Sequence, residues 1–183
     1  KLTSVTDPNG LVTTVLSYDG QGQPTKVRNP DTTEWTFVYD ARGRIAGAGL
    51  APAGGTPVMS VYAYDVQGQL LTYTNTLNRS WSFGYDAARR LTRVDDPSGD
   101  RASYAHDLLG NVTRVEYSAG AAPAVFWEDS AFDALGRLLR TIRGNGQTWT
   151  YSHDVEDNLA TIADPLTAVE TNGFDALNRL VST

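Results

Sequence analysis

The sequence has 183 residues, of which 40% are hydrophobic and 20% charged, and a chain of this length and composition can fold and bury a hydrophobic core. It contains no cysteine, which excludes disulfide bonds, thiolate nucleophiles and thiolate metal ligands. The formal net charge of -6 argues against nucleic acid as a partner, and no apolar run approaches the ~20 residues that cross a bilayer.

An internal repeat dominates the sequence. An aromatic residue or histidine followed by aspartate recurs eight times, and we call these pairs the anchors: Tyr18-Asp19, Tyr39-Asp40, Tyr64-Asp65, Tyr85-Asp86, His106-Asp107, Phe132-Asp133, His153-Asp154 and Phe174-Asp175. Successive anchors are 21 residues apart, except for two intervals of 25 and 26 residues. The extra residues fall in segments 49–57 and 118–123, which are rich in Gly, Ala and Pro and are predicted to be lengthened loops.

Each repeat predicts two strands. After the anchor comes a turn whose fourth residue needs a positive φ, and five repeats place glycine there: Gly22, Gly43, Gly68, Gly110 and Gly136. The alternating runs 24–27, 91–94 and 112–115 then predict an outgoing strand. The chain reverses at segments such as 7–10, 96–99 and 144–146, and it returns through strands such as 35–39, 81–85 and 149–153, where large rings occupy every second position.

The repeat therefore predicts an all-β fold of tandem antiparallel β-hairpins that form a long curved sheet, a spiral or a partial shell. We expect residues 1–183 to be a single array of about eight hairpins, cut inside a repeat at both ends and so a fragment of a longer protein. Open sheet edges at its ends could associate edge to edge with other copies. The anchor aspartates are expected to accept hydrogen bonds from the turn amides, which is a structural role.

Several residues are candidates for a catalytic or metal-binding site. His106 and His153 could act as bases beside Asp107 and Asp154, but they occupy ring positions of the repeat, so no catalytic residue and no enzyme activity are predicted. Paired-carboxylate chemistry by the anchors is rejected for the same reason. The acidic turn 95–100 could hold Ca²⁺, but it lacks the ligand spacing of a calcium loop, so neither a metal nor a cofactor is predicted.

Aromatic and basic residues leave alternatives open. Trp35, Trp81 and Trp149 share one register, which favours packing over a stacking surface for sugars, whereas Trp127 breaks that register and could be exposed. The sequence also predicts a basic stripe that faces solvent or a cavity and is neutralised by neighbouring acids, made of Lys26, Arg93, Arg114 and Arg140.

The pattern Tyr-Asp-x-x-Gly-Arg-Leu, nearly complete at Tyr39–Ile45, Tyr64–Leu70 and Phe132–Leu138, resembles the RHS or YD repeat family over essentially the whole chain. That family includes bacterial polymorphic toxins, the C components of insecticidal toxin complexes and the teneurins. The resemblance implies a β-sheet shell that, in the toxin members, encloses a variable C-terminal toxic domain. In the teneurins a similar barrel belongs to a cell-surface adhesion protein.

The resemblance implies a non-catalytic structural segment of a shell that encapsulates or displays a polypeptide cargo. Its partners would be the remainder of a larger parent protein and a C-terminal toxin domain, in a secreted or cell-surface assembly whose export signal lies outside this chain. The self-cleaving aspartate pair of the toxin members is not found. The alternative is a cell-surface adhesion module that binds carbohydrate or protein through the long loops near residues 49–57 and 118–124.

Overall fold

The computed structural model describes residues 1–120 and 122–183, and these residues form strands joined by turns, without a helix. Position 121, inside the second lengthened loop, lies outside the described residues. In the part of the chain that is described, no helix is long and apolar enough to span a membrane. The strands are β1 (Ser4–Thr6), β2 (Val12–Tyr18), β3 (Pro24–Arg28), β4 (Glu34–Tyr39), β5 (Ile45–Ala51), β6 (Val58–Tyr64), β7 (Leu70–Thr74), β8 (Ser80–Tyr85), β9 (Leu91–Asp95), β10 (Arg101–His106), β11 (Val112–Ser118), β12 (Ala124–Phe132), β13 (Leu138–Arg143), β14 (Thr148–His153), β15 (Leu159–Ala163), β16 (Val169–Thr171), β17 (Gly173–Phe174) and β18 (Leu180–Ser182).

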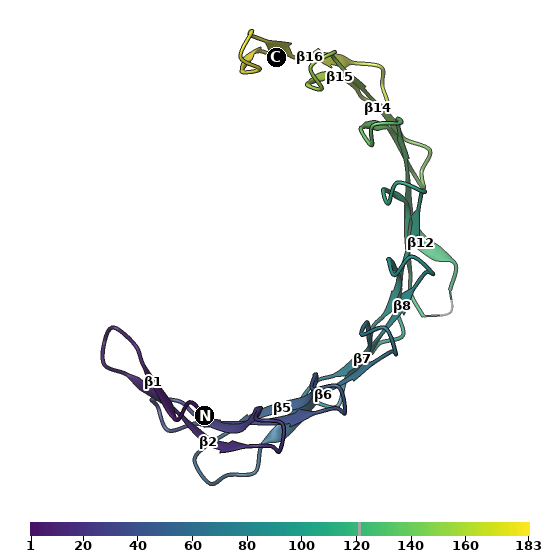
Figure 1. Cartoon of the computed structure of the whole chain (residues 1–183). Helices are drawn as coiled ribbons and strands as arrows, with labels where there is room; N and C mark the ends of the chain where they lie inside the picture. Colours follow the sequence, from purple (N-terminus) through teal and green to yellow (C-terminus); the bar gives the residue numbers. More distant parts are fainter. Residues whose placement is uncertain (121) are drawn as a thin grey trace. The chain divides into compact units, whose positions relative to one another are not determined.

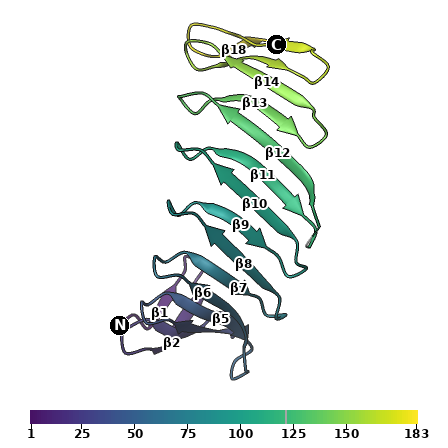
Figure 2. The ribbon, with the colours of Figure 1, turned by 90° about the vertical axis from the view of Figure 1, so that its right-hand side faces the viewer.

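The chain divides into two compact units, unit 1 (Lys1–Phe83) and unit 2 (Gly84–Thr183). Strands β1 to β16 follow one another in the sheet in the order of the chain, and β17 pairs with β18 separately. Within each unit the neighbours pair antiparallel. Each unit is a curved ribbon of hairpins (Figure 1), and β9 to β14 lie side by side in chain order (Figure 2). The predicted all-β fold of consecutive antiparallel hairpins is confirmed.

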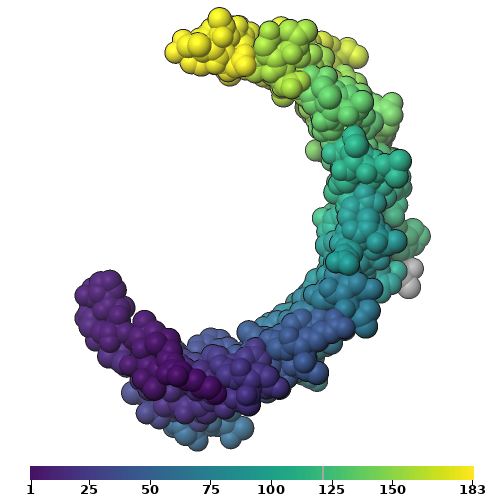
Figure 3. Space-filling view, viewed as in Figure 1, coloured from purple at the N-terminus to yellow at the C-terminus, as the bar shows by residue number. Residues whose placement is uncertain are grey.

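Each unit is only one sheet thick (Figure 3). Among the described residues, Ala51 is the one buried hydrophobic side chain, at 7% exposure, so these residues do not form the hydrophobic core that length and composition allow. The physical reason is that a single layer has no second layer to cover either of its faces, so side chains on both faces keep contact with water. Stability must come from contacts between adjacent strands rather than from a core.

Aromatic rings supply many of these contacts. In unit 1, Tyr62 lies opposite Tyr73 and Tyr73 opposite Trp81, with ring centroids 5.2 and 5.4 Å apart. In unit 2, Tyr117 lies opposite Phe126 at 5.8 Å. Residues directly opposite one another in an antiparallel pair share a face of the sheet, so within each unit these rings gather on one face, which we call the ring face.

Candidate functional site

The anchor turns are built around the aspartate side chain. Oδ1 of Asp133 accepts hydrogen bonds from the backbone N–H groups of Leu135 and Arg137, both at 2.9 Å, and Oδ2 accepts from Nε of Arg137 at 2.7 Å. In all eight anchors Oδ1 accepts the backbone N–H four residues later. The aspartate thus closes the turn that starts at its own position, because its carboxylate satisfies amides that the turn leaves unpaired.

The fourth residue of each anchor turn has a positive φ. The five glycines at this position have φ between 78° and 98°, at Gly22, Gly43, Gly68, Gly110 and Gly136. Arg89, Asp157 and Asn178 take the same left-handed conformation in the other turns, at 67°, 68° and 58°. Arginine is rare in this region because its Cβ crowds the backbone, so the turn imposes the conformation on Arg89 despite its cost.

Successive anchor turns also bind one another along the edge of the ribbon. Nη1 of Arg44 donates to the carbonyl of Asp65 at 3.1 Å, and the guanidinium of Arg44 stacks on the Tyr64 ring at 4.5 Å. Similar bonds run from Gln23 to the Gly43 carbonyl, from Arg90 to the Asp107 carbonyl and from Arg137 to the Asp154 carbonyl. We call these turn-to-turn bonds the edge clasp; within the units they tie four anchor turns to the turns that follow them, beyond the pairing of strands.

In seven of the eight anchors the ring sits beside a β-bulge, which lets the strand enter the turn. The Tyr39 hydroxyl donates to the carbonyl of Pro24 at 2.8 Å, and the Tyr64 hydroxyl donates to the carbonyl of Ile45 at 2.9 Å. At the equivalent positions Nδ1 of His106 and Nδ1 of His153 are buried and have no hydrogen-bond partner in the described parts of the chain. A nitrogen enclosed in this way is poorly placed to exchange protons with a substrate.

The ionised anchors predict loss of stability in acid. Hydrogen bonds from the backbone N–H and guanidinium of Arg137 lower the pKa of Asp133, and amide donors of Asn111 lower the pKa of Asp107. The pKa is also lowered at Asp40, Asp86, Asp154 and Asp175. A carboxyl whose folded pKa lies below its ordinary 3.8 contributes stability above that pH, and the contribution disappears as the pH falls toward the folded pKa. We expect the concentration of guanidinium chloride that unfolds half of the protein to be lower at pH 3 than at pH 5. An equal concentration at both pH values would contradict this assignment.

The acidic turn weighed as a calcium site already uses its oxygens internally. Nε of Arg101 donates a hydrogen bond to Oδ1 of Asp95 at 2.5 Å, and the backbone N–H of Asp100 donates one to Oδ1 of Asp96 at 2.9 Å. Oδ1 of Asp100 accepts the backbone N–H of Gly120 at 3.0 Å. Outside position 121, no group of three or more Asp, Glu, His or Cys side chains is arranged to hold a metal ion.

Trp127 lies on the face opposite the ring face. It is paired with Glu116, whereas its neighbour Phe126 is paired with Tyr117 on the ring face, and adjacent residues of a strand point to opposite sides. Trp127 stands five residues before its anchor ring, whereas Trp35, Trp81 and Trp149 stand four residues before theirs, and a shift of one residue reverses the face. Trp127 is half-buried, with the Arg114 guanidinium 4.8 Å from its ring centroid.

Three of the four predicted stripe residues form ion pairs with neighbouring acids. The pairs are Lys26–Glu34 at 2.6 Å, Arg93–Asp95 at 3.0 Å and Arg114–Asp129 at 2.8 Å. The fourth, Arg140, lies opposite Thr150 in the β13–β14 register. These pairings limit the positive charge that the three residues present to an anionic ligand.

At the opposite edge of the ribbon, three further turns accompany those predicted at segments 7–10, 96–99 and 144–146. In these turns the backbone carbonyl of Asn29, Asn75 or Asp164 accepts a hydrogen bond from the backbone N–H three residues later. The residues that donate these bonds, Thr32, Asn78 and Thr167, have positive φ. Oδ1 of Asn75 and Oδ1 of Asp164 also close the turn as in the anchors. An Asp or Asn midway between anchors was the signal that could have located these turns.

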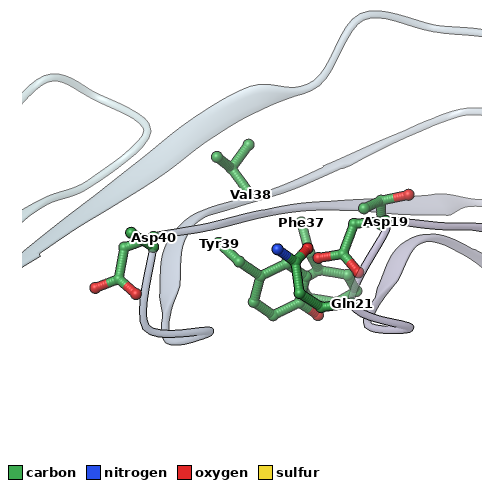
Figure 4. Close-up of a pocket in the computed structure, with 8 residues that line it drawn as sticks. Asp19, Gln21, Phe37, Val38, Tyr39 and Asp40 are labelled. Carbon is green, nitrogen blue, oxygen red and sulfur yellow. The ribbon is translucent and has the colours of Figure 1, made fainter.

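Unit 1 has an open hollow between two anchor turns (Figure 4). Asp19, Gln21, Phe37 and Tyr39 lie on one side of the strand, and Val38 lies on the other. Burial, together with the negative charge of Asp19, raises the pKa of the Tyr39 hydroxyl. Oδ1 of Asp19 already accepts the Gln23 backbone N–H at 2.8 Å, so the hollow belongs to the turn architecture.

The geometry above is repeated through the chain, and a family of known repeats shares it. The sequence profile of the RHS repeat matches residues 1–34, 18–56, 64–101 and 132–169, which together make up more than two thirds of the chain. The chain belongs to the RHS repeat family. The resemblance inferred from the anchor pattern is thereby confirmed.

Solved structures of toxin complexes share the fold of this RHS repeat array. A crystal structure of TcdB2-TccC3-Cdc42 is 19% identical, with a TM-score of 0.71, over 93% of this chain and 10% of that chain. A structure of the Photorhabdus luminescens Tc holotoxin pore is 19% identical, with the same TM-score, over 94% of this chain and 10% of that chain. The array thus spans about a tenth of the length of these chains. No curated protein matched the sequence.

Proposed function

We propose that residues 1–183 are a segment of the wall of a larger RHS protein, and that this wall shelters or displays a polypeptide cargo. The observation that carries the proposal is the one-layer ribbon of hairpins in chain order, which uses its side chains to join neighbouring repeats. Such an array lengthens by adding repeats without changing those already present, which suits a wall. The similarity to toxin-complex structures supports the same reading.

The proposed partners are the remainder of the parent protein and a C-terminal toxin domain, in a secreted or cell-surface assembly. We propose that the 183 residues act as a single array without an active site of their own. The internal use of the anchor carboxylates and the buried Nδ1 atoms of His106 and His153 support a non-catalytic role.

A binding module is the second candidate. One observation favours it: an apolar hollow in unit 1 is lined by Trp35, Leu50, Val58 and Leu77, and the last three side chains are 45%, 61% and 74% exposed. Exposed apolar groups of this kind mark contact surfaces in many proteins. A carbohydrate or peptide ligand would lie against the Trp35 ring.

A chimaeric protein tests whether residues 1–183 can form part of a wall that protects a cargo. Residues 1–183 replace the structurally matching stretch of a full-length toxin-complex protein that carries a protease-sensitive cargo. We expect the cargo to resist protease as it does in the unmodified parent, and a chimaera with alanine at Asp40, Asp86 and Asp133 to lose that resistance. If the unmutated chimaera assembles but its cargo is digested as fast as free cargo, the proposal fails. Binding of the isolated chain to a glycan or peptide array, abolished by Trp35→Ala, would favour the second candidate.

A further inference from the structure

The first lengthened loop lies over a buried carboxylate. Glu34, the first residue of β4, is only 3% exposed although the sheet is a single layer. It lies opposite Ala51, the last residue of β5, where the loop begins. The backbone N–H of Gly54, inside the loop, donates to Oε2 of Glu34 at 3.4 Å.

Two cations complete the surroundings of Glu34. Nζ of Lys26 lies 2.6 Å from Oε2, and Nε and Nη2 of Arg28 lie 2.9 and 2.6 Å from Oε1. Both cations come from β3, whereas β5 and segment 52–57 contain no titratable side chain. Glu34 is therefore the group whose ionisation decides whether these donors have an acceptor. The lysine and arginine bonds, with a smaller contribution from Gly54, lower its pKa from 4.5 to about 2.

The second lengthened loop has the same kind of bond. The backbone N–H of Gly120 donates to Oδ1 of Asp100 at 3.0 Å. In both loops the donor is a glycine 20 residues after the carboxylate. Two insertions of different sequence thus use one device to hold a loop against the ribbon.

We propose that segment 52–57 is a strap held against the sheet by the ionised Glu34 side chain, and that neutralising this carboxyl releases the strap while β4 and β5 stay paired. A neutral carboxyl or amide binds Lys26 and Arg28 weakly, so both cations return to water and leave the carboxyl group without its partners. The strap then loses the hydrogen bond that joins it to β4. The wall would thereby gain a movable segment at one edge without unfolding its hairpins.

A spin label reports on the strap. Because the chain has no cysteine, Ala53→Cys creates a single labelling site. In the labelled protein that keeps Glu34 we expect the motion of the spin label to be restricted. Glu34→Gln should shorten the rotational correlation time of the label roughly threefold, while the circular dichroism spectrum of the strands stays unchanged. Glu116→Gln, which breaks an ion pair with Arg114 in unit 2, is the matched control and should leave the label restricted.

An acid titration provides the second measurement if Glu34→Gln fails to fold. Because the folded pKa of Glu34 lies below 4.5, the strap is held fully above pH 4.5 and is released as the pH falls through about 2. The label should become mobile before the circular dichroism of the strands is lost. A label that is already mobile at pH 7, that stays restricted in a folded Glu34→Gln protein, or that moves only when the strands unfold would overturn the proposal.

Discussion

Replacing Asp133 by alanine is expected to lower the thermal midpoint of unfolding by roughly 5 °C. The substitution removes the acceptor of the Leu135 and Arg137 backbone amides and leaves them without a partner inside the turn. It also releases the Arg137 guanidinium, which then holds the next anchor turn less firmly through the edge clasp. Circular dichroism in the β-sheet region, recorded against temperature at pH 7, gives the midpoint.

Two control variants separate the turn from the clasp. Asp133→Asn keeps the Oδ1 acceptor and loses only the charged bond to Arg137, so about half of the shift should remain. Asp157→Asn removes the other negative charge that Arg137 binds, keeps a residue that tolerates the left-handed conformation of position 157, and leaves the 133–137 turn intact, so its effect should be small. If Asp133→Ala has the same thermal midpoint of unfolding as the unsubstituted chain, the side chain of the anchor aspartate does not stabilise the turn.

Adding one methyl group at Gly49 is expected to lower the free energy of unfolding by about 2 kcal/mol. Gly49 is buried in β5, and a Cβ there would lie 2.8 Å from the Val58 carbonyl oxygen and 2.7 Å from Sδ of Met59. The methionine side chain can move, but the carbonyl belongs to the adjacent strand and is held by the register. Urea unfolding of Gly49→Ala measures the loss.

Gly20→Ala is the matched control, because nothing lies within 4 Å of a Cβ at that position. Its free energy of unfolding should stay within about 0.5 kcal/mol of that of the unsubstituted chain. Equal stability of Gly49→Ala and Gly20→Ala would mean that β5 and β6 do not approach as closely as the structure has them.

The sequence predicts this fold well because the repeat is built from local rules. An Asp that closes its own turn, a glycine with positive φ and rings at every second residue are properties of segments of five to seven residues. Repetition at a fixed spacing then makes each hairpin the neighbour of the next, so pairing in chain order follows without knowledge of tertiary contacts. The anchors from Tyr18 to Phe174 could be located for this reason.

Features that depend on side-chain contacts or on loop conformation could not be predicted. The spacing of Trp127 indicates that it leaves the register of the other tryptophans, but its half-buried position against the Arg114 guanidinium is not visible in the sequence. The hydrogen bond from Gly54 to Glu34 requires segment 52–57 to approach β4, and nothing near Glu34 in the sequence indicates this. Composition could not show that the described residues would form no core, because it counts apolar residues without saying whether a second layer covers them.

The single layer also bears on function. Its exposed apolar side chains include Leu108, Leu109, Leu135 and Val155 at the anchor turns of unit 2, which are 66% to 103% exposed. A wall that joins further repeats has such apolar side chains available for contact. The edge clasp joins successive anchor turns through bonds that need no substrate.

Cross-strand nuclear Overhauser effects in the full 183-residue chain test the central claim most directly, namely that each repeat is a hairpin paired only with its neighbours in one layer. Backbone contacts should join Tyr73 to Trp81, Thr141 to Trp149 and Tyr151 to Ile162, with side-chain contacts confined to strands adjacent in the sheet. Contacts between strands that are not neighbours, for example between Val94 of β9 and Ile162 of β15, would place a second layer on the ribbon and contradict this account.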